Sequence, residues 1–386
     1  MRTGLSEEQI FSTVRQMKLR VPLKNFLRFL TIMFSIPGMG KVRLLEKKKI
    51  SMKTTIIRSK RQWEKNVDGN SPVALFQRWD WGEIQKQCGA KAFCFGYFKK
   101  NTCIGVALAV IVKAKRGNFL HVRHGPILAD WDAKTFASII SHLKKIAREE
   151  YCVCVRISPC IENNEEYKTM FHKTGGIPAA IHAMDEEYSL VLDVGISEEQ
   201  ILANMRKTTR YEIRKAQKLG VSIEKSTDPK SLSVFFDLYN KTAIRQGFVE
   251  HKSIKEEFGV FASENRAVHI MGIVDGKPIA SAIILFVGSE AIYRHGASVH
   301  SSIPASYLVQ WEAICEAKRR GMDKYNFWGI SPTDDHNHPW YGLTLFKKGF
   351  GGYVRETLHA YDFPVSRRYW AFRIIELVRK RIRGYL

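Results

Sequence analysis

The sequence predicts an α+β fold in which two similar halves each build a mixed sheet flanked by helices. Three observations support this: the length of the chain, an order of elements that occurs twice, and a tripeptide that recurs at the same place in that order. A chain of 386 residues exceeds the range in which one hydrophobic core usually suffices, and 45% of its residues are apolar. We therefore expect two folded domains.

The first unit is visible as alternating and apolar runs bounded by short polar turns. These runs predict strands over Ala92–Phe98, Cys103–Val112 and Phe119–His124, then a helix over Ala133–Glu149 and a strand over Cys152–Ile157.

The same order returns in the second unit. Strands are expected over Ala267–Val274, Ile279–Val287 and Ala291–His295, followed by a helix over Ala305–Arg320 and a strand over Lys324–Trp328. Five matching elements in one order indicate a duplicated unit.

The tripeptide Arg-His-Gly marks the end of the third strand in both units, at residues 123–125 and 294–296. One tripeptide alone could match by chance, but the surrounding elements match as well. A mostly antiparallel sheet flanked by helices resembles the tandem acetyltransferase (GNAT-type) architecture. We therefore expect a first domain over 52–195, a second over 196–358, and a basic C-terminal helix within 359–386 that packs back on the first domain.

Charge is uneven along the chain. The 61 Lys and Arg residues exceed the 38 Asp and Glu residues by 23, and much of this excess lies in residues 1–51 and 367–386. Such a surface attracts nucleic acid, phosphates or anionic lipid, although solvated tails could explain part of it. Residues 1–51 are expected to be a basic extension, either disordered or upstream of the true start.

Two further features bear on location. The apolar run Phe26–Ile36 is too short to span a bilayer but could lie on a membrane surface. Seven cysteines without a C-x-x-C pair indicate a reducing compartment. We expect a cytoplasmic protein, with peripheral contact to an anionic membrane at the inner face of the plasma membrane.

A helix over Ser197–Leu219 is predicted between the two units, because Ser197 is a good N-cap and Gly220 a stop signal. On one flank Arg206, Arg210 and Arg214 form a column of like charges that repel each other. Arg side chains in this spacing suit phosphate oxygens. A solvated face with Glu212 as partner is the alternative.

The stretch Tyr325–Glu356 is rich in aromatic residues, His and Gly, and we expect a functional loop there. Its glycines, Gly349, Gly351 and Gly352, would let the backbone approach a ligand closely. His336 and His338 form only a weak metal pattern, so no metal site is predicted. The turn expected to bind coenzyme A reads HGASVHSSIP and lacks the required glycines, so an acetyl-CoA user is disfavoured.

Taken together, several segments resemble the Fem family (FemA, FemB and FemX types), which builds peptidoglycan cross-bridges on paired acetyltransferase-like domains. The resemblance covers Met52 to Leu386, and its carriers are FQRWDWGEIQK, HVRHGPILAD, RISP, NMRKTTRYEIRKAQKLGV, YNFWGI and GLTLFKKGFGG. A long coiled-coil insertion is missing, which is similar to the FemX type.

The resemblance implies an aminoacyltransferase that needs no cofactor. Aminoacyl-tRNA would be the co-substrate, and the acceptor would be the stem-peptide amine of UDP-MurNAc-pentapeptide or lipid II. An aminoacyl ester is already activated, so the protein need only position the reactants and stabilise the oxyanion. We expect a monomer.

The resemblance also implies site residues. Lys347 matches the position proposed to stabilise the oxyanion and the tRNA end, beside Phe346. Lys86, Arg210, Arg214 and Lys215 match the neighbourhood that grips the precursor's diphosphate.

Tyr293, His295 and Trp328 would line the substrate cleft, and His295 could take the proton of the amine. Two other functions stay open: acylation of another small amine or polysaccharide, and non-catalytic nucleic-acid binding by the basic helix.

Overall fold

The computed structural model describes residues 52–70, 72–246 and 251–385. The predictions made for residues 1–51 and for Phe26–Ile36 lie outside this part of the chain. Within it, no helix is both long and apolar enough to cross a membrane.

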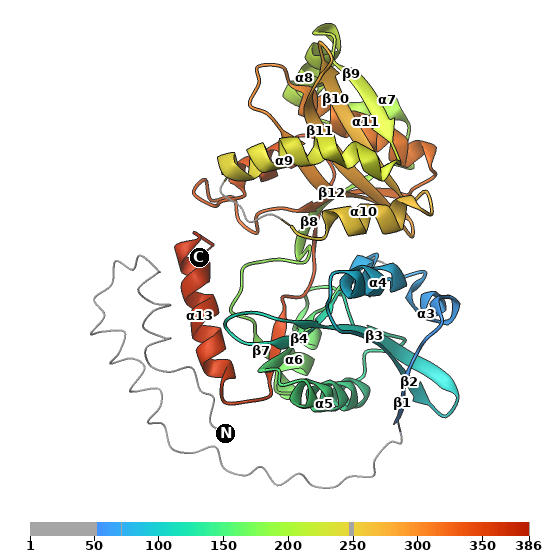
Figure 1. Cartoon of the computed structure of the whole chain (residues 1–386), viewed down its shortest axis with the longest axis vertical. Helices are drawn as coiled ribbons and strands as arrows, with labels where there is room; N and C mark the ends of the chain where they lie inside the picture. The colour runs from blue at the N-terminus through green and yellow to red at the C-terminus, as the bar shows by residue number, and fades with distance from the viewer. Residues whose placement is uncertain (1–51, 71, 247–250, 386) are drawn as a thin grey trace, which may run out of the picture. The chain divides into compact units, whose positions relative to one another are not determined.

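The first sheet has eight strands and is mixed, in the order β1-β2-β3-β4-β6-β15-β7, with β5 paired to β3 (Figure 1). Only β4 and β6 pair in parallel. Its strands are β1 (Met52–Ile56), β2 (Ala92–Lys99), β3 (Thr102–Val112), β4 (Phe119–Arg123), β5 (Ile127–Leu128), β6 (Cys154–Ser158), β7 (Ile177–Pro178) and β15 (Tyr361–Pro364).

The second sheet has seven strands in the order β14-β8-β13-β12-β11-β10-β9, and again one pair, β12 with β13, is parallel. Its strands are β8 (Tyr188–Asp193), β9 (Ser222–Ser226), β10 (Ala267–Val274), β11 (Lys277–Val287), β12 (Glu290–Ser298), β13 (Lys324–Gly329) and β14 (Tyr353–Glu356).

The duplication is confirmed by this topology. In each sheet three antiparallel strands are followed by a long helix and then by a strand that pairs in parallel with the third. The helices are α5 (Ala133–Glu149) in the first unit and α11 (Ala305–Arg319) in the second. The predicted α+β class with tandem GNAT-like units is the observed one.

The other helices cover the faces of the two sheets. By the first sheet lie α3 (Lys60–Val67), α4 (Trp79–Gln87), α6 (Glu165–Lys173) and α13 (Tyr369–Ile382). By the second lie α7 (Glu198–Asn204), α8 (Lys207–Lys218), α9 (Leu232–Gln246), α10 (Ile254–Ala262) and α12 (Tyr341–Lys348).

Three large hydrophobic cores follow from this layering, beside smaller clusters such as the one around Phe372. One lies under α5 and α6, and another lies under α7, α8 and α11. The third is shared, since it contains Trp63 and Phe76 from the first unit and Phe235, Phe258 and Ile283 from the second. The two units are therefore joined by common apolar packing.

The chain passes from the first sheet to the second before the predicted domain limit. β8 precedes the expected limit at 195/196, yet it pairs with β13 and β14 of the second sheet. Its residues Leu190, Val191 and Leu192 are all buried, as a strand between two neighbours requires. β15 returns to the first sheet, and α13 packs there through Phe372.

The helix predicted over Ser197–Leu219 is instead two helices, α7 and α8, separated at Met205 and Arg206. Ser197 does cap α7, in a capping box with Gln200. At the break the Arg206 N–H donates to the Gly349 carbonyl (2.9 Å). Contact with the glycine-rich loop thus replaces one turn of helix, which local propensity alone could not predict.

Candidate functional site

The two Arg-His-Gly tripeptides meet at one aromatic ring. The Arg123 guanidinium lies 3.4 Å from the centroid of the Phe76 ring, and the Arg294 guanidinium lies 5.5 Å from the same centroid. His124 and Trp328 also contact this ring, with centroids 4.5 and 5.7 Å away. The duplicated motif therefore builds the junction between the two units.

Each glycine of the motif leaves room for a polar side chain. A Cβ atom on Gly125 would lie 2.5 Å from the Gln77 amide, and one on Gly296 would overlap the Tyr293 hydroxyl. Gln77 then bonds the Leu108 N–H and the Arg123 carbonyl. Close packing against these side chains therefore requires glycine at the third position of each Arg-His-Gly motif.

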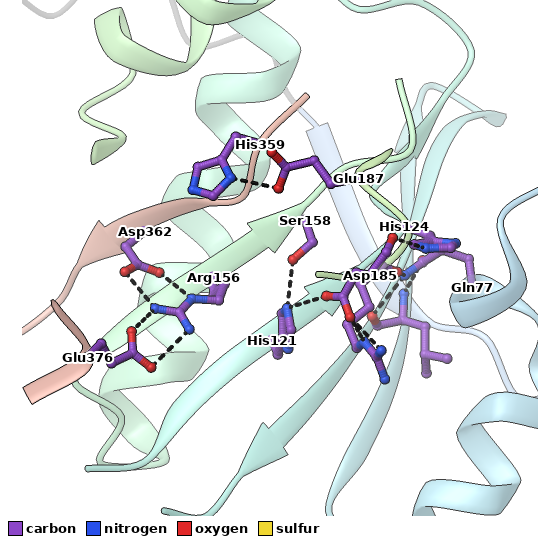
Figure 2. A network of polar contacts seen from close by, with 12 residues as sticks. Gln77, His121, His124, Arg156, Ser158, Asp185, Glu187, His359, Asp362 and Glu376 are labelled. Atoms are coloured by element: carbon purple, nitrogen blue, oxygen red, sulfur yellow. Dashed lines mark hydrogen bonds and ion pairs between the residues drawn. The ribbon is translucent and has the colours of Figure 1, made fainter. Parts of the chain in front are cut away.

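Asp185 organises the polar side of the junction, as Figure 2 shows. Its carboxylate pairs with Arg123 and lies 3.4 Å from His121 Nε2, which is 2.9 Å from the Ser158 hydroxyl. His124 Nε2 donates to the Asp185 carbonyl (2.8 Å). Burial lowers the pKa of His121 and of His124 to about 3. Both imidazoles are therefore neutral near pH 7, and the positive charge comes from Arg123.

Beside this network lies a cavity of about 400 Å³. Apolar side chains such as Phe76, Trp81 and Leu108 form part of its wall. Its cationic lining comes from four places in the sequence: Arg116 before β4, Arg123 on β4, Arg156 on β6, and a group on and just after α13 made of Arg379, Lys380 and Arg383. Asp185 and Glu376 add carboxylates to the wall. A cavity with this lining suits an anionic ligand that has an apolar part.

α13 is fastened to the cavity floor by a buried ion cluster. Arg156, 2% exposed, donates to Asp362 through Nε (2.6 Å) and to Glu376 through Nη2 (2.6 Å) (Figure 2). Both carboxylates are themselves buried.

Lys347 forms a second centre, on α12. It is 4% exposed, its Nζ donates to the Gly329 carbonyl (2.7 Å), and it lies 5.8 Å from the centroid of the Tyr293 ring. Burial lowers the pKa of Lys347 to about 7, against the opposing effect of the Glu186 carboxylate. A lysine in this state can donate hydrogen bonds as an ammonium or act as a neutral amine near physiological pH.

A buried polar cluster supports this centre. Arg355 pairs with Glu186 and with Glu290, and the Asn326 amide donates to both carboxylates. Glu186 Oε2 has no hydrogen-bond partner among the described residues. Glu186 is thus a buried carboxylate with one oxygen still able to accept a hydrogen bond.

Backbone strain gathers at the same place. Asp185, Glu186 and Trp328 have φ values of 55°, 67° and 66°, a region that non-glycine residues rarely occupy. Strained residues of this kind concentrate at functional sites. Because Asp185 faces the cavity and Glu186 faces the Lys347 cluster, two consecutive residues connect the two centres.

The structure separates Tyr293 and His295, which the sequence analysis assigned to one substrate cleft. Tyr293 packs with the core under α11, beside Lys347, whereas His295 contacts Phe235 of α9 and lies 3.7 Å from Glu257 of α10. The register of β12 shifts between these residues, so a bulge at Arg294 turns them to opposite faces. His295 therefore lies away from Lys347.

Trp328 and Phe346 are the other two aromatic residues named as site candidates. Trp328 lies at the junction described above. Phe346 packs against Tyr307 and Phe350, with centroids 4.9 and 5.4 Å away. Phe350 is fully buried, so this part of the stretch is core.

The four cations predicted to grip a diphosphate do not form one group. Lys86 lies on α4, where it pairs with Glu83. Arg210 folds back along α8 and its Nη1 donates to the carbonyls of Leu202, Ala203 and Met205. It therefore caps α7 at the helix break. Lys215 and the exposed Arg214 lie on α8 by the second sheet.

The glycine-rich loop after Lys347 approaches the protein's own backbone. A Cβ atom on Gly351 would lie 2.8 Å from the Asn204 carbonyl oxygen, and one on Gly352 would lie 2.3 Å from that of Val191. The expected close approach of a ligand is thus replaced by close packing on α7 and β8.

Sequence reasoning missed three kinds of functional residue. The cations of α13 belong to the predicted basic C-terminal helix, but nothing in their local sequence indicated that they would line a cavity. Arg123 was noticed only as part of a repeat. Glu186 and Arg355 gave no local signal, because they are 169 positions apart and meet only in the fold.

Comparison with known proteins agrees with this architecture. The FemAB family model matches residues 59–255 and 266–377. The lipid II:glycine glycyltransferase of Staphylococcus aureus (strain MRSA252) is 19% identical over 396 residues, covering 82% of this chain and 93% of that protein. The homologue in strain USA300 is 19% identical over 388 residues, covering 80% and 91%.

Two solved structures share the fold. The crystal structure of FemX superposes with a TM-score of 0.71 at 17% identity, covering 84% of this chain and 100% of that one. A tandem GNAT protein from the clavulanic acid biosynthesis pathway gives a TM-score of 0.53 at 11% identity, covering 82% and 99%. From the family match over most of its length, the chain belongs to the FemAB family and is an acyltransferase.

Proposed function

We propose that this protein transfers an amino acid from aminoacyl-tRNA to the stem-peptide amine of a peptidoglycan precursor, UDP-MurNAc-pentapeptide or lipid II, and so builds the interpeptide bridge. The observation that carries the proposal is Lys347, a buried lysine with a pKa of about 7 between the Gly329 carbonyl and the Tyr293 ring. The names of the staphylococcal relatives support the acceptor class.

The chemical step is aminolysis of an ester. The acceptor nitrogen attacks the ester carbonyl carbon, and a tetrahedral intermediate with a negatively charged oxygen forms. The bond from carbon to the ribose oxygen then breaks, leaving an amide. The proton lost by the nitrogen ends on the ribose oxygen, so the products are the extended peptide and free tRNA.

Lys347 is suited to stabilise the negative oxygen. Its ammonium has three donors and uses one on Gly329, which leaves two for a reacting group. In a buried site such a donor is worth more than in water, and removing one costs about 100-fold in rate in well-studied cases. Glu186 supports this role, because its carboxylate favours the ammonium form of Lys347.

The cavity is suited to the anionic part of the acceptor. Arg379 and Arg383 present guanidinium groups to it and Lys380 adds an ammonium, whereas Arg116 and Arg123 in its wall already pair with carboxylates. A guanidinium can bond two phosphate oxygens at once, which fits a diphosphate. The apolar wall around Trp81 offers a surface for the rest of the precursor.

The tRNA is expected to contact α8. Lys207, Arg214 and Lys218 are exposed on this helix. Its N-cap, Arg206, bonds Gly349 just after the helix α12 that carries Lys347. Exposed cations of this kind bind a nucleic-acid backbone in a salt-dependent manner.

The test is transfer of radiolabelled amino acids from a charged tRNA pool to both precursors. Wild type should label at least one acceptor, and Lys347→Ala should lower the rate about 100-fold. Lys348→Ala is the matched control, because the neighbouring Lys348 pairs with the exposed Asp334. Its rate should stay within about threefold of wild type.

The proposal fails if folded wild type labels neither acceptor, or if Lys347→Ala and Lys348→Ala have the same effect. Acylation that needs coenzyme A and ignores tRNA would instead support acylation of another amine.

A further inference from the structure

The helix α13 has two apolar sides. Tyr369 and Phe372 point inward to the first sheet, together with Glu376. The opposite side carries Trp370, Ile374, Leu377 and Arg381, spaced so that they line up along one face. We call these four residues the outer stripe.

The outer stripe presents large side chains to solvent. Trp370 is 44% exposed and Leu377 is 42% exposed, and Ile382 at the end of the helix is 55% exposed. A surface helix normally carries polar residues on this side. Apolar residues here mark a surface that meets something other than water.

Exposed cations lie at both ends of the outer stripe, with Arg367 and Arg368 before Trp370 and Arg381 at its C-terminal end. Residues 367–386 contain seven Lys and Arg residues and a single acid, Glu376. That acid is 5% exposed and bonds Arg156 and Arg116, so it faces inward. The exposed side of α13 is therefore cationic and apolar together, the composition of helices that lie on anionic bilayers.

We propose that α13 docks the protein on an anionic bilayer, with the outer stripe entering the interface and the flanking Arg and Lys side chains meeting lipid phosphates. An uncharged apolar partner would make no favourable electrostatic contact with the cations at the ends of the outer stripe. The occupant that matches both features is a membrane of anionic lipid.

The docking surface and the cavity share the helix α13. Arg379, Lys380 and Arg383 line the cavity while Trp370 and Leu377 face outward from the same helix. Docking through the outer stripe would hold the cavity near the bilayer surface, where the diphosphate of a lipid-linked precursor lies. This inference rests on the proposed function, and it indicates that the acceptor is the lipid-linked precursor.

The binding test uses the full chain with vesicles of equal parts phosphatidylglycerol and phosphatidylcholine, and vesicles of phosphatidylcholine alone. Wild type should bind the anionic vesicles about tenfold more tightly or better. Trp370→Ser combined with Leu377→Ser should weaken that binding about tenfold or more. Tyr151→Ser, a control at a residue 89% exposed, should bind as wild type does.

Arg381→Glu keeps both apolar side chains and should also weaken binding, with the loss shrinking as salt is raised. Thermal melting checks that each variant is folded. Unchanged binding of the Trp370 and Leu377 double variant overturns the proposal. A loss seen only with Phe29→Ser and Phe34→Ser overturns it too, because the N-terminal run would then be the anchor.

Kinetics separate this proposal from the proposed function. The double variant should transfer normally to the UDP-linked acceptor and poorly to the lipid-linked acceptor in vesicles. If neither acceptor is ever labelled but vesicle binding follows the outer stripe, the transfer proposal fails and the docking proposal stands. Equal transfer to vesicle-bound acceptor by wild type and double variant overturns the docking role.

Discussion

The proposed reaction assigns its central step to a single buried lysine, and the cost of this lysine to the fold is measurable. Burial lowers the Lys347 pKa from its ordinary 10.5 to about 7. Between these pH values the unfolded chain holds one more proton than the folded chain, so stability rises as pH rises through that window. Below about pH 7 both states are charged, and the folded state bears the full cost of burying the ammonium.

Replacing this side chain with an apolar one of similar size should therefore stabilise the protein. At about pH 6, Lys347→Met is expected to raise the free energy of unfolding by about 1–3 kcal/mol, after the lost bond to Gly329 is counted. The gain should shrink by about pH 9. Urea unfolding at both pH values measures it.

Lys348→Met serves as the comparison, since Lys348 is only partly buried and pairs with exposed Asp334. Its effect should be small and similar at both pH values. A Lys347→Met variant that is less stable than wild type at pH 6 would contradict the buried, costly lysine described above.

The motif made Lys347 a catalytic candidate, which stays a prediction, but its surroundings could not be predicted. Its sequence neighbours Phe346 and Lys348 gave no sign that Glu186 and Gly329 would flank it. Tyr293 reaches Lys347 only because a bulge turns it away from His295. Such bulges depend on the pairing of three strands, which local sequence does not encode.

At the scale of elements, strands and long helices were predicted closely, because their apolar periodicity is strong. α5 was predicted residue for residue, and α11 to within one position. The failures share one cause, which is contact with other parts of the chain. The break between α7 and α8 is set by the contact with Gly349, more than 100 residues away. The helix α12, inside an expected loop, is set by packing of aromatic side chains.

α13 supplies the element-scale prediction, because buried ions fasten it. Glu376→Ala would leave Arg156, a buried cation, with only Asp362 as carboxylate partner. We expect a loss of about 3–5 kcal/mol in the free energy of unfolding. Glu312→Ala, which breaks the half-buried pair with Lys225, should cost less than about 1 kcal/mol.

Denaturant titration of both variants decides the point. Equal losses for Glu376→Ala and Glu312→Ala would mean that the ion cluster does not hold α13, and the link between that helix and the cavity floor would have to be abandoned.

At the scale of the whole molecule, the proposed function assigns different tasks to the two duplicated halves. The first half carries the cavity, with cations from β4 and α13, and the second carries Lys347 and its polar cluster. The repeated Arg-His-Gly motif joins them at Phe76 and leads into the strained pair Asp185 and Glu186. Duplication was readable from the sequence, whereas this division of tasks required the fold.

The measurement that tests this division most directly is steady-state transfer kinetics with Lys347→Ala and Arg383→Ala beside wild type. Lys347→Ala should lower kcat about 100-fold and leave the KM for the acceptor within about threefold, because it acts on the transition state. Arg383→Ala should raise that KM about tenfold and leave kcat nearly unchanged, because it removes a contact made equally in both states. If both variants change the same constant, the division of tasks between cavity and lysine is contradicted.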